Sequence, residues 1–191
     1  STMSQQRVPA SPSRRRTFTA VGIAAATATG VFVPASAGAD ETPNESHCVI
    51  TIEGVQSTGE YITSDPVCFG TLAEALASAG AAVDPSARIN ASDVQSQNLA
   101  ATAASGVIAL HYDGFNRTSS SITISGSDCS GGYLNLSSDW TNRISSTLNF
   151  CPVVRFFDGF DKSGGSEATY AATINLGGLN NAANSVQYAS S

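Results

Sequence analysis

The side chains of this sequence that could carry out chemistry are few: two histidines, four cysteines and scattered carboxylates. The sequence contains neither the His-Glu-x-x-His pattern of zinc hydrolases nor the Gly-x-Ser-x-Gly turn of serine hydrolases. His47 and His111 lie in different parts of the chain, and a lone histidine is more often structural than catalytic. Asp158 and Asp161 resemble a carboxylate pair for glycoside hydrolysis, but Asp158 precedes Gly159 in a turn sequence. These observations predict that the protein is not an enzyme.

The N-terminal segment 1–39 has the order of a secretory signal. Arginines at 14–16 precede an uncharged stretch at 20–33, and a small-residue A-x-A cleavage pattern ends at Ala39. The uncharged stretch of 14 residues is too short to span a bilayer. The arginine pair followed by Thr-Phe resembles the twin-arginine export motif. We therefore predict a secreted protein whose mature chain begins at residue 40.

The mature chain is strongly acidic. The full sequence has 9 basic and 15 acidic residues, and four of the arginines lie within residues 1–39. The mature chain then has 5 basic and 15 acidic residues, a net charge of −10. Such a surface disfavours nucleic acid and anionic membranes and favours cations. We expect no nucleic-acid partner and no membrane association in the mature form.

The four cysteines, Cys48, Cys68, Cys129 and Cys151, all follow the predicted cleavage site. An even number of cysteines in an exported chain predicts disulfides, and three pairings are possible. We favour Cys48–Cys68 and Cys129–Cys151, because each pair then stays within one predicted domain. In the chain-entropy model each bond is worth about 3 kcal/mol.

Residues 107–188 contain the same pattern twice. The segment 111–116 returns as 156–161, with Tyr112 and Phe157 at equivalent positions, and each copy runs on to an Asn- and Ser-rich segment. Each copy is rich in β-branched and aromatic residues separated by turn formers, which predicts four short strands. The predicted strands cover residues 107–112, 121–125, 132–136 and 144–148 in the first copy and residues 153–157, 167–171, 173–176 and 185–188 in the second.

An Asp-Gly pair follows the first strand of each copy, at Asp113-Gly114 and Asp158-Gly159. This pair is typical of a tight type I′ hairpin turn. Two four-stranded units of about 40 residues predict a mainly β fold, a sandwich of two Greek keys over residues 106–191.

The repeated motifs resemble those of βγ-crystallin domains. The family pattern is an aromatic residue, a glycine seven positions later, and an Asn/Asp-Asn/Asp-x-x-Ser/Thr-Ser segment. The second copy has Phe157 and Gly164, whereas the first has Tyr112 with Ser119 at the glycine position. The third element corresponds to residues 141–146 and 180–185. The resemblance implies a double Greek-key β-sandwich.

The resemblance also implies calcium as a cofactor, because the Asn- and Ser-rich segments of this family supply oxygen ligands. Thr141 replaces the leading Asn/Asp of the first segment, and Asn184 replaces the hydroxyl residue of the second. We therefore expect one weak site, formed by exchange between copies with Ser145 near Asn180, or no metal at all if the segments only anchor hairpins. The candidate ligands are Asn142, Ser145, Asn180, Asn181, Asp113 and Asp158.

An alternative function is inhibition of a secreted metalloprotease. Secreted actinobacterial metalloprotease inhibitors also resemble this fold, with two disulfides. A rigid loop held by a disulfide loses little entropy on binding. Residues 147–153, around Cys151, and residues 126–132, around Cys129, are the two candidate loops, and the sequence does not choose between them.

Residues 40–105 are predicted to form a small α+β unit that a disulfide stabilises. The segment 48–53 alternates as a half-buried strand does. Thr71 and Glu74 form a capping box that opens a helix over residues 72–79. A second helix is predicted over residues 92–103.

Overall fold

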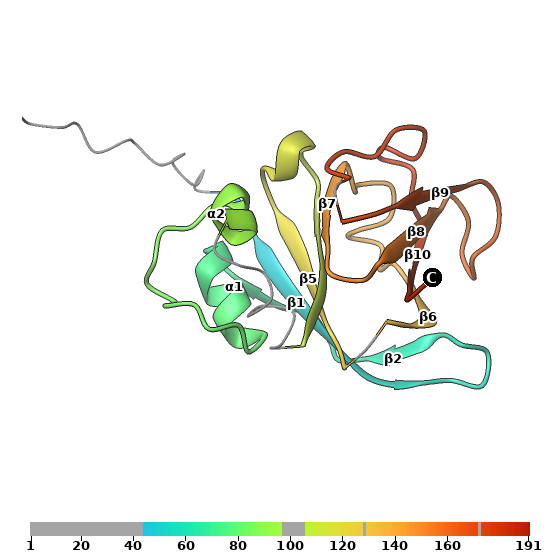
Figure 1. Ribbon diagram of the computed structural model, residues 1–191, viewed down its shortest axis with the longest axis horizontal. Coiled ribbons are helices and arrows are strands. Elements are labelled where there is room, and N and C mark those ends of the chain that lie inside the picture. Colours follow the sequence, from blue (N-terminus) through green and yellow to red (C-terminus); the bar gives the residue numbers. More distant parts are fainter. Residues whose placement is uncertain (1–43, 97–105, 128, 172) are drawn as a thin grey trace, which may run out of the picture. The chain divides into compact units, whose positions relative to one another are not determined.

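The computed structural model describes residues 44–96, 106–127, 129–171 and 173–191, so the predicted signal segment and residues 97–103 of the second predicted helix lie outside it. Strands dominate the described residues (Figure 1). The strands are β1 (His47–Val55), β2 (Tyr61–Thr63), β3 (Val67–Phe69), β4 (Val107–Tyr112), β5 (Ser121–Ser125), β6 (Ser130–Asn135), β7 (Ser146–Asn149), β8 (Val153–Phe157), β9 (Ser166–Thr169) and β10 (Ser185–Ala189). The helices are α1 (Leu72–Ser78), α2 (Ala91–Ser96) and the short 3₁₀ helix η1 (Phe115–Arg117).

The third segment of each copy lies against the sheet of the other copy. The first sheet has the order β2-β1-β5-β4-β7, with β3 also paired to β1, and the second has the order β6-β10-β8-β9. Thus β6, from the first copy, pairs with β10 of the second copy. In return, Asn175 of the second copy bridges Ser146 of β7. This exchange confirms the predicted mainly β, double Greek-key sandwich.

The predicted strands 107–112, 121–125 and 153–157 have the bounds of β4, β5 and β8. The predicted strand 173–176 was wrong, because this segment forms only an isolated bridge between Asn175 and Ser146, with backbone hydrogen bonds from Thr147 N to Ile174 O and from Leu176 N to Ser145 O. One bridge is too little to make a ladder.

The prediction of tight type I′ turns was also wrong. Gly114 has φ −100°, and Gly159 is not among the residues with positive φ. The left-handed residues come later in each loop: Asn116, Arg117 and Ser119 in the first copy, and Asp161, Lys162 and Gly164 in the second. The loops are therefore longer, and the same three positions bend each of them.

Serine hydroxyls fix these loops. Ser146 Oγ accepts a hydrogen bond from Arg117 N at 2.8 Å and donates one to Gly114 O. Ser185 Oγ accepts from Lys162 N at 3.2 Å and donates to Gly159 O at 2.7 Å. The last serine of each Asn- and Ser-rich segment is therefore a hairpin anchor, a contact that a purely local reading of Asp-Gly misses.

Ser119 occupies the left-handed position where the second copy has Gly164, with φ 65° and 78° respectively. We expect Ser119→Gly to raise the free energy of unfolding by about 0.5–1 kcal/mol, because a residue with a Cβ is strained there. Gly164→Ser is the reciprocal control and should destabilise, because a Cβ would come 1.9 Å from Asp158 Oδ1, the acceptor for Gly165 N. Urea unfolding of both variants tests this, and a Ser119→Gly variant less stable than the parent would contradict it.

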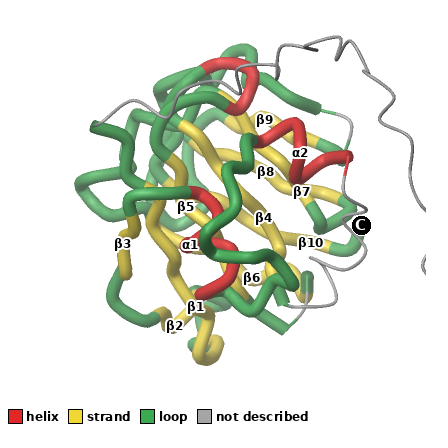
Figure 2. Tube along the Cα trace, turned by 90° about the vertical axis from the view of Figure 1, so that its left-hand side faces the viewer, coloured by secondary structure: helices red, strands yellow, loops and turns green. Residues whose placement is uncertain are grey.

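The N-terminal residues 44–96 extend the first sheet. β1 pairs in parallel with β5 and antiparallel with β2 and β3. Thr71 caps α1 by accepting from Glu74 N at 3.2 Å, which confirms the capping box. Figure 2 shows α1 and α2 over one face of this sheet.

The helices and sheets enclose two hydrophobic cores. The first lies between the sheets and includes Ile50, Ile124 and Phe156. The second lies between the helices and the first sheet and includes Leu76 and Leu110. β4 is buried along its whole length because it faces both cores. Residues 44–96 thus share a sheet and a core with residues 106–191, and their division into two domains stays a prediction about independent folding.

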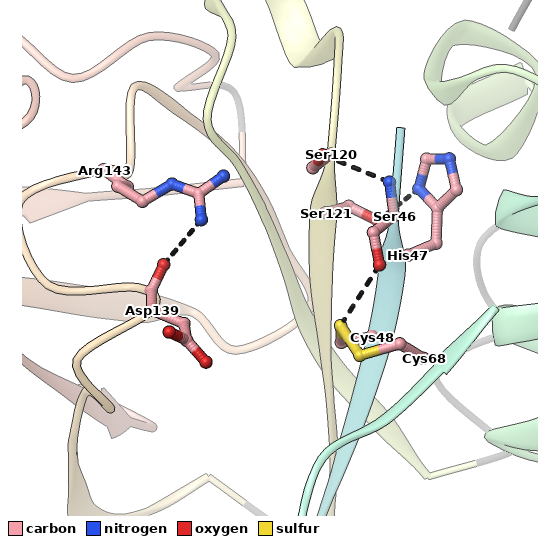
Figure 3. Close-up of a disulfide and its surroundings, with 8 residues drawn as sticks. All are labelled: Ser46, His47, Cys48, Cys68, Ser120, Ser121, Asp139 and Arg143. Carbon is pink, nitrogen blue, oxygen red and sulfur yellow. Dashed lines mark hydrogen bonds between the residues drawn. A yellow bond between two sulfur atoms is a disulfide. The ribbon is translucent and has the colours of Figure 1, made fainter. Parts of the chain in front are cut away.

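Both predicted disulfides are present. Cys48 and Cys68 face each other across the β1–β3 ladder (Figure 3). Cys129 lies where the chain passes from β5 in the first sheet to β6 in the second, and Cys151 lies where it passes from β7 to β8. The second disulfide therefore joins two crossings between the sheets.

Candidate metal-binding site

The Asn- and Ser-rich segments of the two copies lie side by side and exchange backbone hydrogen bonds. Asn142 N donates to Ala183 O, and Asn181 N donates to Ile144 O, both at 2.9 Å. Each segment is also tied to the first strand of its own copy, as in the 2.8 Å bond from Ser145 N to Tyr112 O. The pairing brings side chains of one copy against those of the other.

We call Asp113, Ser145, Asn180 and Asn181 the first oxygen cluster. Ser145 is 2% exposed, and its Oγ donates to Asn181 Oδ1 across the two copies at 2.9 Å. Side chains of the two copies therefore meet here, but the hydrogen bond of Ser145 is made to Asn181 and not to Asn180, and the exchange of metal ligands stays a prediction. Asn180 Oδ1 and Asp113 Oδ1 are buried and have no hydrogen-bond partner among the described residues. All of these atoms are hard oxygens, the ligand type that calcium prefers.

Arg143 lies beside this cluster, and the sequence analysis missed its role. Its Nη2 is 2.6 Å from Asp113 Oδ2. Its Nη1 donates to Asp139 O at 2.7 Å (Figure 3). The guanidinium also lies 5.2 Å from the centre of the Trp140 ring. A positive charge on the cluster's one carboxylate weakens its attraction for a metal ion. No local pattern predicts a contact that spans 30 residues of sequence.

The second cluster, Asp158, Asn142 and Asn184, is different. Asn184 Nδ2 donates to Asp158 O, so an amide nitrogen stands where the first cluster has the Ser145 hydroxyl. Asp158 Oδ1 accepts from Gly165 N at 2.7 Å, and Asn142 is exposed. A donor nitrogen repels a cation, so the second cluster offers a poorer set of ligands than the first.

His111 is fully buried and belongs to a chain of hydrogen bonds between the sheets. Its Nε2 is 2.8 Å from the Tyr188 hydroxyl, and its Nδ1 is 2.9 Å from Thr147 Oγ1. Thr147 Oγ1 donates to Asn149 Oδ1 at 2.6 Å, and Asn149 Nδ2 donates to Thr169 Oγ1 at 2.8 Å. Thr169 Oγ1 donates to a backbone carbonyl of β8 at 3.0 Å. Burial lowers the pKa of His111 to about 3, so this histidine is neutral and inaccessible to a substrate.

The described residues contain no group of three or more His, Cys, Asp or Glu side chains that could hold a metal ion. Within those same residues, no helix has the length and apolar character needed to cross a bilayer.

The two loops considered for protease inhibition differ in exposure. Residues 147–149 belong to β7 and are buried, and Cys151 is 0% exposed, which leaves Pro152 exposed. In the segment 126–132, Ser127 and Ser130 are exposed. Asp128 lies outside the described residues.

No family model matches the chain, and no curated protein does. Solved structures that resemble it are βγ-crystallin domains. The domain from Clostridium beijerinckii is 16% identical, and the match covers 44% of this chain and 99% of that chain with a TM-score of 0.38. A double mutant of that domain is 18% identical, with coverages of 44% and 98% and a TM-score of 0.37. A βγ-crystallin from an archaeon is 12% identical, with coverages of 44% and 98% and a TM-score of 0.34.

Proposed function

We propose that this protein is a secreted, non-catalytic β-sandwich module that binds one calcium ion weakly at the first oxygen cluster. The observation that carries the proposal is the contact between Ser145 Oγ and Asn181 Oδ1 across the two copies. The partnerless oxygens of Asn180 and Asp113 add to it, because a buried oxygen without a partner is costly and a cation would satisfy it. Two disulfides fit an oxidising environment such as the cell exterior.

The affinity should be low. The cluster has one carboxylate, Asp113, and that carboxylate already binds Arg143. We expect a dissociation constant of roughly 10⁻⁴–10⁻³ M, the range of weak extracellular calcium modules. The second cluster should bind no calcium in this range, because Asn184 directs an amide nitrogen at the Asp158 carbonyl.

Calorimetric titration with calcium tests the proposal, with Trp140 fluorescence as a second signal because Trp140 contacts Arg143. Ser145→Ala should abolish binding by removing a ligand, and Asn181→Asp should tighten it about tenfold by adding a charge. Asn184→Ala is the matched control from the second cluster and should leave the affinity unchanged.

The variant Arg143→Ala distinguishes a cluster that binds metal from one that only stabilises the fold. Removing the guanidinium frees the Asp113 carboxylate, so calcium affinity should rise several-fold while stability falls slightly. The proposal fails if millimolar calcium gives no heat and no rise in melting temperature with the unmodified protein or with Arg143→Ala.

The alternative, inhibition of a secreted metalloprotease, is tested by assaying a thermolysin-like enzyme with and without the protein. The exposed part of the Cys129 segment is the better candidate loop, because Cys151 is buried. Inhibition that survives loss of calcium binding in Ser145→Ala would make the inhibitor the leading function.

A further inference from the structure

The two disulfides differ in how far solvent reaches them. Cys68 is exposed, as is Val67 beside it in β3. Cys151 is 0% exposed, and Cys129 is partly buried and packs against the first core. Among the described residues β3 pairs with β1 only, so no further strand covers Cys68. A thiol in solution can therefore approach Cys68, whereas packing shields the other disulfide, and access is one of the factors that set the rate of thiol–disulfide exchange.

A hydroxyl lies beside the other sulfur of the exposed disulfide. Ser46 Oγ is 3.7 Å from Cys48 Sγ (Figure 3). The sulfur of a disulfide has no proton, so the Ser46 hydroxyl is the donor and Cys48 Sγ is the acceptor. A donor at this position stabilises the negative charge that develops on Cys48 Sγ when the bond between the sulfurs breaks.

Backbone hydrogen bonds hold Ser46 in place independently of its side chain. Ser46 N donates to Ser120 Oγ at 3.2 Å, and Ser46 O accepts from Ser121 N at 3.1 Å. The hydroxyl of Ser46 is therefore directed at the disulfide by the backbone, and its removal leaves these two contacts intact.

The fold does not depend on a closed Cys48–Cys68 bond. β3 is also held by a ladder of three residue pairs with β1, and Phe69 at its end packs against the second core. Neither cysteine belongs to a core cluster. The bond is worth about 3 kcal/mol in the chain-entropy model, which is less than the roughly 5–15 kcal/mol by which a typical domain is stable. The bond can therefore open without unfolding the chain.

We propose that Cys48–Cys68 is a site of thiol–disulfide exchange, at which a small dithiol opens the bond in the folded protein while Cys129–Cys151 stays closed. A thiolate of the dithiol attacks Cys68 Sγ and forms a mixed disulfide with it. The bond between the two protein sulfurs breaks, and its electron pair passes to Cys48 Sγ beside the Ser46 hydroxyl.

The second thiol of the same dithiol completes the reaction. It loses its proton and attacks the dithiol sulfur of the mixed disulfide, which releases Cys68 as a thiolate. The dithiol leaves as a cyclic disulfide, and each of the two cysteines takes up one proton. Two electrons thus pass from the dithiol to the protein, and the two protons that the dithiol loses balance those that the cysteines gain.

Dithiothreitol is the probe, applied to the folded full chain at constant pH without urea. Samples are quenched with acid, free thiols are alkylated with N-ethylmaleimide, and peptide mapping identifies the labelled cysteines. We expect Cys48 and Cys68 to be labelled together, about tenfold faster or more than Cys129 and Cys151. The opened protein should still melt cooperatively. Equal rates for the two disulfides, faster opening of Cys129–Cys151, or opening of Cys48–Cys68 only in urea that unfolds the chain would each overturn the proposal.

Three variants test the hydroxyl beside the leaving sulfur. Ser46→Ala should slow the opening by about three- to tenfold, because the exchange rate depends on the stability of the leaving thiolate. Ser46→Thr keeps a hydroxyl and should open at the rate of the parent. Ser86→Ala, whose hydroxyl bonds Asp84, is the matched control with an unchanged rate. A Ser46→Ala variant that opens as fast as the parent would refute the assignment of Cys48 as the leaving sulfur, and the proposal with it.

Discussion

Acidification from pH 6.5 to pH 3 should cost the folded protein up to about 5 kcal/mol through His111 alone, since each unit of pKa shift is worth about 1.4 kcal/mol. Burial lowers the pKa of His111 from 6.5 to about 3. Between pH 6.5 and about pH 3, the imidazole of His111 is therefore protonated in the unfolded chain and neutral in the folded protein. The stabilising contribution is complete above pH 6.5 and is lost as the pH falls towards 3.

The hydrogen-bond chain explains why this histidine must stay neutral. Thr147 Oγ1 gives its one proton to Asn149 Oδ1, so it accepts at His111, which assigns the ring proton to Nδ1 and makes Nε2 the acceptor of the Tyr188 hydroxyl. Thr147 then donates to Asn149, which donates to Thr169. Each side chain in this series of hydrogen bonds therefore donates to the next, from Tyr188 towards Thr169. A second proton on the ring would make Nε2 a donor, displace the proton of the Tyr188 hydroxyl and bury a positive charge between two neutral hydroxyl partners.

The measurement is the free energy of unfolding in urea between pH 4 and pH 7 for the parent and for His111→Gln. The variant should be less stable than the parent at pH 7. Below pH 6.5, His111 should make the parent's free energy of unfolding fall by about 1.4 kcal/mol per pH unit, and the variant should lack this contribution. Carboxylates titrate equally in both proteins and cancel in the difference. Parallel stability curves for the two proteins would show that His111 does not resist protonation in the folded state.

Replacing Cys129 and Cys151 together by alanine should lower the free energy of unfolding by about 4 kcal/mol. The loop that the disulfide closes has a sequence separation of 22, which is worth about 3 kcal/mol in the chain-entropy model. The rest comes from packing, because Cys151 is 0% exposed in the core between the sheets and alanine leaves a small cavity there.

The other disulfide is a matched control. Cys48–Cys68 has a sequence separation of 20, so its entropic contribution is nearly the same, but Cys68 is exposed and Cys48, although buried, belongs to neither of the two core clusters. Replacing Cys48 and Cys68 by alanine should therefore cost about 3 kcal/mol. Urea unfolding compares the two double variants. A larger loss for the Cys48–Cys68 pair would refute the argument from burial.

Local patterns predicted the features that depend on neighbours in sequence. The strands at 107–112, 121–125 and 153–157 are bounded by turn residues, and the capping box of Thr71 is complete within four residues. The Asp-Gly turns failed because distant serines, Ser146 and Ser185, set the geometry of the loops.

The candidate site also depends on contacts between residues that are distant in sequence, and local patterns did not predict these contacts. The family resemblance implied a site shared between the two copies with Ser145 near Asn180, but Asn181, with a left-handed φ of 54°, is the residue that hydrogen-bonds Ser145. Arg143 meets Asp113 only because two loops of the fold meet.

The parallel pairing of β1 with β5 has a consequence for how the chain folds. The paired residues His47 and Ser121 are 74 positions apart, whereas the disulfides close separations of 20 and 22. Closing the longer loop costs more entropy, and contacts between distant residues slow folding. Both disulfides and the hairpins of residues 106–191 can therefore form before β1 arrives. Until it does, β5 is an open edge that another copy can pair with, so concentrated refolding favours aggregation.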